Sequence, residues 1–415
     1  MVPNGWEFTT FEHHIDLLSG FAFKSAQYTE NSDDIRLLRG DNIAPNTLRW
    51  DGVKTWDKHQ YAELQKYHLR ENDFVIAMDR TWVSSGLKVA EVTKNDLPCL
   101  LVQRVARIRS LPTLEQSLLR QYFSSHRFEQ YVKGVQTETA VPHISSKQIK
   151  EFPLLLPPLP EQRKIAQILS TWDRGITTTE KLIDASKQQK KALMQQLLTG
   201  KKRLVDPKTG KAFEGEWEEV KLGDVTAMNS GGTPKSSVSE YYDGIHPWVS
   251  IADMTKHGKW ISKTEKSLTD AGLANSSARL YPKGTVLYAM YASIGECSIS
   301  TVELCSSQAI LGIRPKDNLI NIYLYYYLVN LKGKIILTGQ QGTQSNLNAG
   351  MVKGFTIKLP TVVEQEKIAS VLTAADKEIE LLNAKLAHLK QEKKALMQQL
   401  LTGKRRVKVA ETEAA

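Results

Sequence analysis

The sequence predicts a mixed α/β (α+β) fold with two globular domains joined by two long antiparallel helices, which form a coiled coil, and with a pseudo-two-fold internal repeat. Three observations predict this fold. A stretch of sixteen residues occurs twice almost unchanged, each copy lies in a segment with helical apolar spacing, and the remaining parts of the two halves match each other only loosely.

The near-exact repeat defines two tails. QQKKALMQQLLTGKKR begins at Gln188 and QEKKALMQQLLTGKRR begins at Gln391, 203 positions later. The same shift aligns LPPLPEQRKIAQIL from Leu156 with LPTVVEQEKIASVL from Leu359, whereas Trp6 matches Trp217 at a shift of 211. We therefore expect domain 1 over residues 1–155, tail 1 over 156–202, domain 2 over 203–358, tail 2 over 359–406 and a C-terminal segment over 407–415.

Each tail carries an apolar stripe with helical spacing. Steps of four and three residues reach mostly apolar side chains, while Glu, Lys and Gln fill the other faces. Pro160 lies where a first helical turn tolerates a missing N–H, and Gly200 and Gly403 follow the last apolar positions, as C-cap glycines do. The residues expected to form the coiled coil and to dock subunits are Ile165, Leu169, Trp172, Ile176, Ile183, Leu193, Leu197, Ile368, Leu372, Ile379, Leu382, Leu386, Leu389, Leu396 and Leu400.

A stripe of this length needs a partner surface. A helix over residues 161–199 spans about 58 Å, and the other tail offers a matching stripe. Two like surfaces pair best about a two-fold axis, which predicts an antiparallel pair with one globular domain at each end. The alternative is that each helix packs on its own domain.

Composition bounds the class of protein. The 415 residues carry a formal charge of +10, which favours an acidic partner, with nucleic acid ahead of a membrane because no basic amphipathic anchor is visible. The densest apolar stretch, FPLLLPPLP, is short and broken by prolines, so no membrane segment is expected. Cys99, Cys297 and Cys305 form no CxxC pair, which suits a reducing cytoplasm.

Motifs for chemistry are missing from the sequence. It contains no GxxxxGK[ST], no strand-turn-helix GxGxxG, no HExxH, and no Asn-Pro-Pro-aromatic or Asp-Pro-Pro-aromatic tetrapeptide of the kind that amino-methyltransferases use. We therefore expect no catalytic residue, no metal site and no cofactor in this chain.

The globular domains carry polar and basic residues at the ends of strand-like runs such as LLRGDNI and LLVQRVARI. Arg and Lys are suited to phosphates and guanine, and Asn and Gln to adenine. A solvated or structural role is the alternative at each position. The candidate DNA-binding residues are Lys24, Arg39, Asp41, Asn42, Arg80, Ser84, Ser85, Lys88, Gln103, Arg104 and His143 in domain 1, and Thr233, Lys235, Trp248, Ser250, Asp253, Ser293, Gln308 and Asn346 in domain 2.

The order of these segments resembles the DNA-specificity (S) subunit of type I restriction-modification systems. The resemblance covers nearly the whole chain, from a variable domain through LPPLPEQRKIAQIL and KKALMQQLLTGKKR to a second variable domain with SGGTPKSS and IHPWVSIADM, and then the second tail. The tails are specific to that family, whereas the variable domains are too divergent for transfer of individual residues.

The resemblance implies a non-catalytic subunit of a prokaryotic cytoplasmic complex. Each variable domain would be a target-recognition domain that reads one half of a bipartite, asymmetric site in double-stranded DNA. The helix pair would set the spacing of the half-sites and dock two modification (methyltransferase) subunits and the restriction (translocase/nuclease) subunits. S-adenosylmethionine, ATP and Mg would be used by those partners.

Two other functions stay open from the sequence. One is a self-contained DNA methyltransferase or nuclease with drifted motifs, which S-adenosylmethionine binding by the isolated chain would reveal. The other is a DNA-binding coiled-coil scaffold or regulator without enzyme partners.

Overall fold

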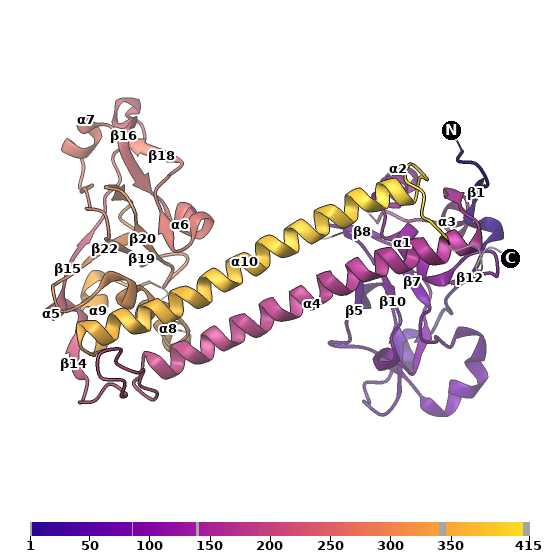
Figure 1. The fold of residues 1–415 in the computed structure, drawn as a ribbon, viewed down its shortest axis with the longest axis horizontal. Helices are drawn as coiled ribbons and strands as arrows, with labels where there is room; N and C mark the ends of the chain where they lie inside the picture. Colours follow the sequence, from indigo (N-terminus) through magenta and orange to yellow (C-terminus); the bar gives the residue numbers. More distant parts are fainter. Residues whose placement is uncertain (1, 85, 138–140, 340–345, 410–415) are drawn as a thin grey trace. The chain divides into compact units, whose positions relative to one another are not determined.

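The computed structural model describes residues 2–84, 86–137, 141–339 and 346–409, without the side chains of residues 334 and 336–339 (Figure 1). The chain separates into two compact units. Unit 1 contains Met1–Glu180 with Ala384–Ala415, and unit 2 contains Lys181–Asn383. Each unit therefore combines one globular domain with a part of both tails.

Unit 1 is built on an antiparallel sheet of order β10-β7-β12-β2 and a second sheet of order β11-β3-β6. The strands are β1 (Glu7–Thr10), β2 (Ile15–Ser19), β3 (Ile35–Leu38), β4 (Ile43–Ala44), β5 (Thr47–Leu48), β6 (Thr55–Trp56), β7 (Phe74–Ala77), β8 (Trp82–Val83), β9 (Gly86–Leu87), β10 (Val89–Glu91), β11 (Cys99–Leu101), β12 (Val105–Ser110) and β13 (Pro153–Leu156). The helices are α1 (Gln116–Phe123), α2 (His126–Val135) and α3 (Ser146–Lys150), and the 3-10 turns are η1 (Phe11–His13), η2 (Ser25–Gln27), η3 (Gly40–Asn42), η4 (Lys58–Tyr67) and η5 (Lys94–Asp96).

Apolar spacing explains why these segments fold together in unit 1. The β7 run FVIA is buried at every position because both faces of its sheet are covered: Phe74 and Ile76 enter one core, and Val75 and Ala77 enter another. The helices α1 and α2 place Leu118, Phe123 and Phe128 on the same core as Phe74 and Ile108. Period-3.6 helices thus cover one face of a period-2 sheet.

Unit 2 has the same plan, with a main sheet of order β15-β22-β19-β20-β17 and a smaller sheet of order β18-β16-β21. The strands are β14 (Glu218–Lys221), β15 (Thr226–Ser230), β16 (Tyr242–Val249), β17 (Trp260–Ile261), β18 (Lys266–Leu268), β19 (Val286–Ala289), β20 (Cys297–Ser300), β21 (Cys305–Ser306), β22 (Ile310–Pro315) and β23 (Thr356–Leu359). The helices are α5 (Leu222–Val225), α6 (Ile251–His257), α7 (Asp270–Ala274), α8 (Asn321–Gly339) and α9 (Ala349–Lys353), and η6 spans Ser239–Tyr241. Its order β15-β22-β19-β20 corresponds to β2-β12-β7-β10 in unit 1, and β17 is an addition that pairs in parallel with β20.

The two tails form the long helices α4 (Leu159–Leu197) and α10 (Val362–Leu400) of Figure 1. The helix α4 begins and ends two residues before the range 161–199 expected for the first tail. Pro160 lies in the first turn of α4, and Gly200 and Gly403 follow the helices with φ of 72° and 67°. The 6→1 hydrogen bonds from Lys202 N to Gln196 O and from Arg405 N to Gln399 O complete the same C-cap twice, both at 3.2 Å.

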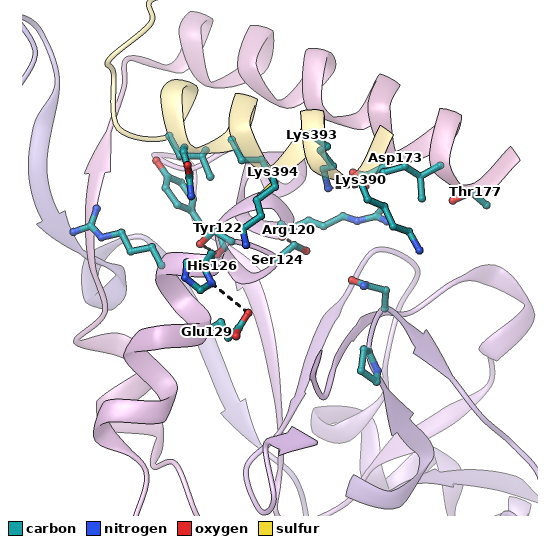
Figure 2. A pocket seen from close by; sticks show the side chains of 18 of the residues that line it. Arg120, Tyr122, Ser124, His126, Glu129, Asp173, Thr177, Lys390, Lys393 and Lys394 are labelled. Carbon is teal, nitrogen blue, oxygen red and sulfur yellow. Dashed lines mark hydrogen bonds and ion pairs between the residues drawn. The ribbon is translucent and has the colours of Figure 1, made fainter. Parts of the chain in front are cut away.

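The long helices pack together and run antiparallel within each unit. In unit 1, the ion pairs Glu161–Arg406, Asp173–Lys393 (Figure 2) and Glu180–Lys390 join rising positions along α4 to falling positions along the second tail. In unit 2, Glu364–Arg203 and Asp376–Lys190 follow the same order. The expected antiparallel pairing is confirmed.

None of the predicted stripe residues is exposed, but the stripe does more than join the helices. Ile165, Leu169 and Leu400 belong to the core of domain 1, and Ile368, Leu372 and Leu197 belong to the core of domain 2. Each domain core therefore takes in the start of its own tail and the end of the other. The coiled-coil prediction and its alternative, packing on the own domain, each describe part of the stripe.

Two further expectations concern the whole chain. No described helix is long and apolar enough to span a membrane. Cys99, Cys297 and Cys305 are buried free thiols, and burial raises the pKa of Cys99 to about 12. Such thiols behave as small apolar core residues rather than as nucleophiles.

Candidate nucleic-acid interface

One end of the main sheet has the same backbone frame in both domains. Gly20 N donates to Val105 O, Met78 N to Arg104 O and Ile144 N to Met78 O in domain 1. In domain 2, the same three bonds join Gly231 N to Ile310 O, Met290 N to Ala309 O and Leu347 N to Met290 O. These bonds identify equivalent positions without reference to the sequence repeat, and they bring four loops together at the ends of the central strands.

Glycine is required at the first position of this frame. A Cβ on Gly20 would lie 2.2 Å from the carbonyl oxygen of Val102, and a Cβ on Gly231 would lie 2.2 Å from that of Ser306. Such contacts are too short for any side chain, so the backbone of both loops approaches the neighbouring strand only with glycine.

The frame in domain 1 carries a compact charged cluster. Arg104 donates through Nη1 to both carboxylate oxygens of Asp79, at 3.1 and 2.8 Å, and His143 Nδ1 lies 2.6 Å from Asp79 Oδ1. The Arg104 side chain remains 62% exposed, so Asp79 orients the guanidinium without covering it. Arg104 adopts φ of 65°, and Arg80, on the next loop, adopts φ of 45°.

Three further predicted residues lie beside this cluster. The Arg39 Nη2 to Asp41 Oδ2 distance is 3.2 Å, and both side chains are exposed. Lys88 is half-buried next to them, where burial lowers the pKa of its ammonium group and the charge of Asp41 partly opposes that shift. The face thus gathers Arg39, Arg80, Lys88 and Arg104, which are donors suited to phosphates and guanine.

Equivalent positions in domain 2 carry different chemistry. Tyr291 stands in the place of Asp79, Ala309 in the place of Arg104 and Asn346 in the place of His143, and all three belong to exposed or half-exposed loops. Ala292 keeps the positive φ of Arg80, at 55°. The neighbouring Thr233 hydroxyl donates to the side-chain oxygen of Gln308, and both residues are exposed.

The other exposed candidates lie on loops, namely Lys24, Ser84, Gln103, Lys235 and Ser293. Ser85 lies outside the described residues.

Four candidates are engaged in holding the fold. Asn42 is buried, donates to Arg49 O at 3.0 Å and accepts from Arg39 N at 3.0 Å. Trp248 is buried and donates to Gly232 O at 2.9 Å. Ser250 and buried Asp253 form the capping box of α6. That these four residues contact bases remains a prediction. Their hydrogen bonds within the fold do not favour it.

Asp79 and Tyr291 were missed by the sequence reasoning. Each follows the methionine that ends a matching run, VIAM in domain 1 and VLYAM in domain 2. Comparing those aligned runs residue by residue would have identified both positions.

A second constellation, the tail latches, is repeated with the same residues. Glu161 accepts from Trp6 Nε1 and Arg406 Nε, and Glu364 accepts from Trp217 Nε1 and Arg203 Nε. The glutamates and arginines of the two latches are 203 positions apart, and the tryptophans are 211 apart. Each latch joins a domain, the start of its own tail and the end of the other tail.

Within the described residues, no three His, Cys, Asp or Glu side chains form a group that could hold a metal ion. Both faces consist of exposed and half-exposed loop residues at the end of a main sheet.

Comparison with known proteins identifies the family. The sequence model described as "Type I restriction modification DNA specificity domain" matches residues 3–187 and 214–391. The chain belongs to this family. Both matched stretches of this specificity-domain protein contain one globular domain and most of the tail that follows it.

Individual relatives agree with this assignment. The chain is 29% identical over 319 residues to the putative type I restriction enzyme MjaX specificity subunit of Methanocaldococcus jannaschii, which covers 74% of this chain and 72% of that protein. It is 37% identical over 182 residues to the EcoAI specificity subunit of Escherichia coli, 44% of this chain but only 30% of that protein's length. The crystal structure of the S subunit from M. genitalium has the same fold, with a TM-score of 0.57 at 15% identity, covering 97% of this chain and 98% of that one.

Proposed function

We propose that this chain is the non-catalytic specificity subunit of a type I restriction-modification complex, and that each globular domain reads one half of a bipartite, asymmetric sequence in double-stranded DNA. The observation that carries this proposal is the repeated backbone frame with different exposed side chains. A shared frame presents loops to a similar DNA groove, and different side chains select different bases.

The two frames favour different bases. In domain 1, an arginine fork held by a carboxylate suits the O6 and N7 acceptors of guanine. In domain 2, Asn346 offers the amide pattern that suits adenine N6 and N7, whereas Gln308 corresponds to Gln103 of domain 1 and does not distinguish the two frames. The basic residues around the domain 1 cluster add sequence-independent contacts to phosphates.

The helix pair sets the half-site spacing and docks the partners in this proposal. The two tails give the chain two equivalent surfaces, which suits two copies of one modification subunit, with restriction subunits joining that complex. S-adenosylmethionine, ATP and Mg are then bound by the partners, in the cytoplasm of a prokaryote. The two tails are nearly identical and lie 203 positions apart, which supports equivalent docking of the two modification subunits.

The decisive experiment is co-expression of this chain with its modification subunit in a methylation-deficient host, followed by sequencing of modified adenines. We expect a two-part motif with a fixed gap that disappears when this chain is omitted. A complex that forms but leaves no such motif would contradict the proposal.

The spacing role has its own test. Four residues inserted after Glu180 and four after Asn383 fall at the boundary of the two units, at positions 203 apart. Each insertion adds one turn, about 6 Å of helix. We expect a longer gap with both half-sites unchanged, and an unchanged gap would exclude the helix pair as the ruler.

A further inference from the structure

Phe21 is an exposed aromatic residue at the end of the main sheet in domain 1. Its backbone belongs to the repeated frame, because it directly follows Gly20 and its N–H donates to Leu101 O at 3.0 Å. Its carbonyl oxygen accepts from Gln103 N at 2.8 Å, and the exposed Arg104 follows Gln103. The backbone therefore holds Phe21 beside residues that are proposed to read the first half-site.

Two other aromatic rings hold the Phe21 ring in place. The Phe23 ring meets it edge-to-face, with centroids 4.9 Å apart and planes at 81°, and the Tyr67 ring lies 5.2 Å away at 49°. Aromatic pairs at such distances attract each other beyond the effect of the area they bury. Phe23 is buried in the core beside the second sheet, so it anchors the pair. Phe21 itself is 39% exposed, which leaves a positioned apolar surface open to solvent.

The loops next to Phe21 carry cations. Phe21 pairs with Val102 as an isolated parallel bridge. Val102 N donates to Leu38 O at 3.2 Å, and Arg39 follows Leu38 in the chain. A single exposed apolar side chain is common on protein surfaces, so exposure alone indicates nothing. The position of Phe21 on the frame, beside the loops of Arg39 and Arg104, indicates a role in recognition.

The equivalent position in domain 2 has no side chain. Gly232 N donates to Ser306 O at 2.9 Å, as Phe21 N donates to Leu101 O, so Gly232 corresponds to Phe21. A Cβ on Gly232 would lie 2.2 Å from the backbone nitrogen of Ala278. The backbone at Ala278 therefore excludes any side chain from this place. An apolar contact at this position of the frame is available to domain 1 alone.

The chemistry of the major groove decides which base such a ring can read. The bases present oxygen and nitrogen acceptors and amino donors there, together with one apolar group, the C5-methyl group of thymine. The polar side chains of the domain 1 frame are suited to the acceptors and donors. An aromatic ring is suited to the methyl group, because contact between them removes apolar surface from water.

We propose that Phe21 determines specificity for one thymine in the first half-site by contact with the C5-methyl group of that base. This inference rests on the proposed function of domain 1 and names a base that the domain recognises without a hydrogen bond. The thymine lies close to the base pair that Arg104 reads, because Phe21 and Arg104 belong to adjoining loops of one frame.

Deoxyuridine tests this contact, because it differs from thymidine only in lacking the C5-methyl group. The chain in complex with its modification subunit is titrated with duplexes in which each thymine of the methylated motif is replaced in turn. We expect one position in the first half-site at which deoxyuridine weakens binding about fourfold, the effect of one buried methyl group. The Phe21→Ala chain should bind thymine and uracil equally at that position and keep its ratios at all others.

Two further variants make the test independent of folding. Phe21→Leu retains an apolar side chain and should keep part of the preference for thymine, even where loss of the ring lowers stability. Phe8 offers a matched control, since it is 61% exposed in the same unit and pairs with Leu155 of β13 rather than with the frame. Phe8→Ala should leave the ratio of thymine to uracil binding unchanged at every position.

The outcomes separate this inference from the proposed function. If no thymine of the first half-site is sensitive to loss of its methyl group, or if the sensitivity persists in the Phe21→Ala chain, Phe21 does not read thymine. An equal loss of affinity for all duplexes, with a lower melting temperature, would assign the ring to packing on Phe23 and Tyr67 alone and also overturn the inference. In each of these cases a two-part methylated motif leaves the proposed function standing. If the unaltered complex methylates no such motif, the proposed function fails and the inference fails with it.

Discussion

The exposed ends of the two main sheets share a backbone, and three equivalent positions on it carry different side chains, whereas Gln103 and Gln308 are equivalent and unchanged. Domain 1 displays Asp79, Arg104 and His143, and domain 2 displays Tyr291, Ala309 and Asn346 at the equivalent positions. The tails behave in the opposite way, since even their side-chain contacts recur. The latches repeat their residues together with their contacts, whereas the sheet ends repeat the backbone frame and change Asp79, Arg104 and His143.

The contrast between the tails and the sheet ends predicts which substitutions affect stability and which affect DNA recognition. A residue whose partner is another repeated residue should affect the stability of the unit that contains it, whereas a residue on the frame should affect one half-site alone. Substitutions at the tail latches and at the frame positions test this division.

The largest effect is expected at the tail latches. The Glu364 side chain is 1% exposed and accepts from both Arg203 and Trp217. Because Glu364→Ala leaves a guanidinium and an indole without their acceptor, unfolding of unit 2 should become easier by about 3 kcal/mol. Glu161→Ala should destabilise unit 1 by less, since Arg406 is 42% exposed and solvent screens its charge. Urea denaturation followed separately in each unit measures both losses of stability. If the Glu364→Ala chain were as stable as the unaltered chain, the latch would not stabilise unit 2.

The next effect is a transplant of the recognition cluster. Tyr291→Asp, Ala309→Arg and Asn346→His together place the domain 1 cluster on the domain 2 frame. Binding to the original second half-site should fall roughly 100-fold as its base contacts are lost, with a new preference for guanine at that place, while the first half-site is unchanged. Methylated-motif sequencing gives both halves at once, and an altered first half-site would show that the faces are not independent.

Arg104→Ala should act on one base. Removing a bidentate guanine contact is expected to weaken binding about tenfold and to relax the first half-site at a single position. The control is Gln308→Ala, which should relax only the second half-site. A uniform loss over all sequences with a shallower salt dependence would instead identify Arg104 as a phosphate contact.

The smallest effect is expected at Asp79, which orients Arg104 and is not expected to contact a base. Asp79→Asn removes a negative charge near DNA, so affinity for unrelated DNA should rise while discrimination at the Arg104 position falls severalfold. Asp79→Glu should restore part of the discrimination. Competition binding with single-base variants of the site separates the two effects, and full discrimination in Asp79→Asn would show that Arg104 needs no orientation.

The sequence predicted the helices well because their signals are local. The apolar period, Pro160, Gly200 and Gly403 are each read within one or two turns, and α4 and α10 follow them. It could not predict that Leu400 enters the core of domain 1, since an apolar stripe does not say which surface it meets. The sharing of each core by both tails is a property of the folded chain.

The candidate site was predicted in outline because residue type and position at a strand end are also local signals. Arg104, Gln308 and Asn346 were found from residue type at strand ends, and the structure places them on the two frames. Whether such a residue is free depends on its partners, which is why Asn42 and Trp248 could not be separated from them by type alone. Ser250 and Asp253 are an exception, because the spacing Ser-x-x-Asp before a helix indicates a capping box in the sequence itself.

The two latches carry a consequence for the ancestry of the chain. Arg203 closes on Glu364 and Arg406 closes on Glu161, so neither half completes its own fold and each is completed by the other. Because the two closures use the same residues, a half-length chain ending after Arg203 could complete a second copy of itself in the same way. The protein has the form expected of a symmetric homodimer whose gene was duplicated in tandem and fused, after which each copy was free to acquire a target of its own.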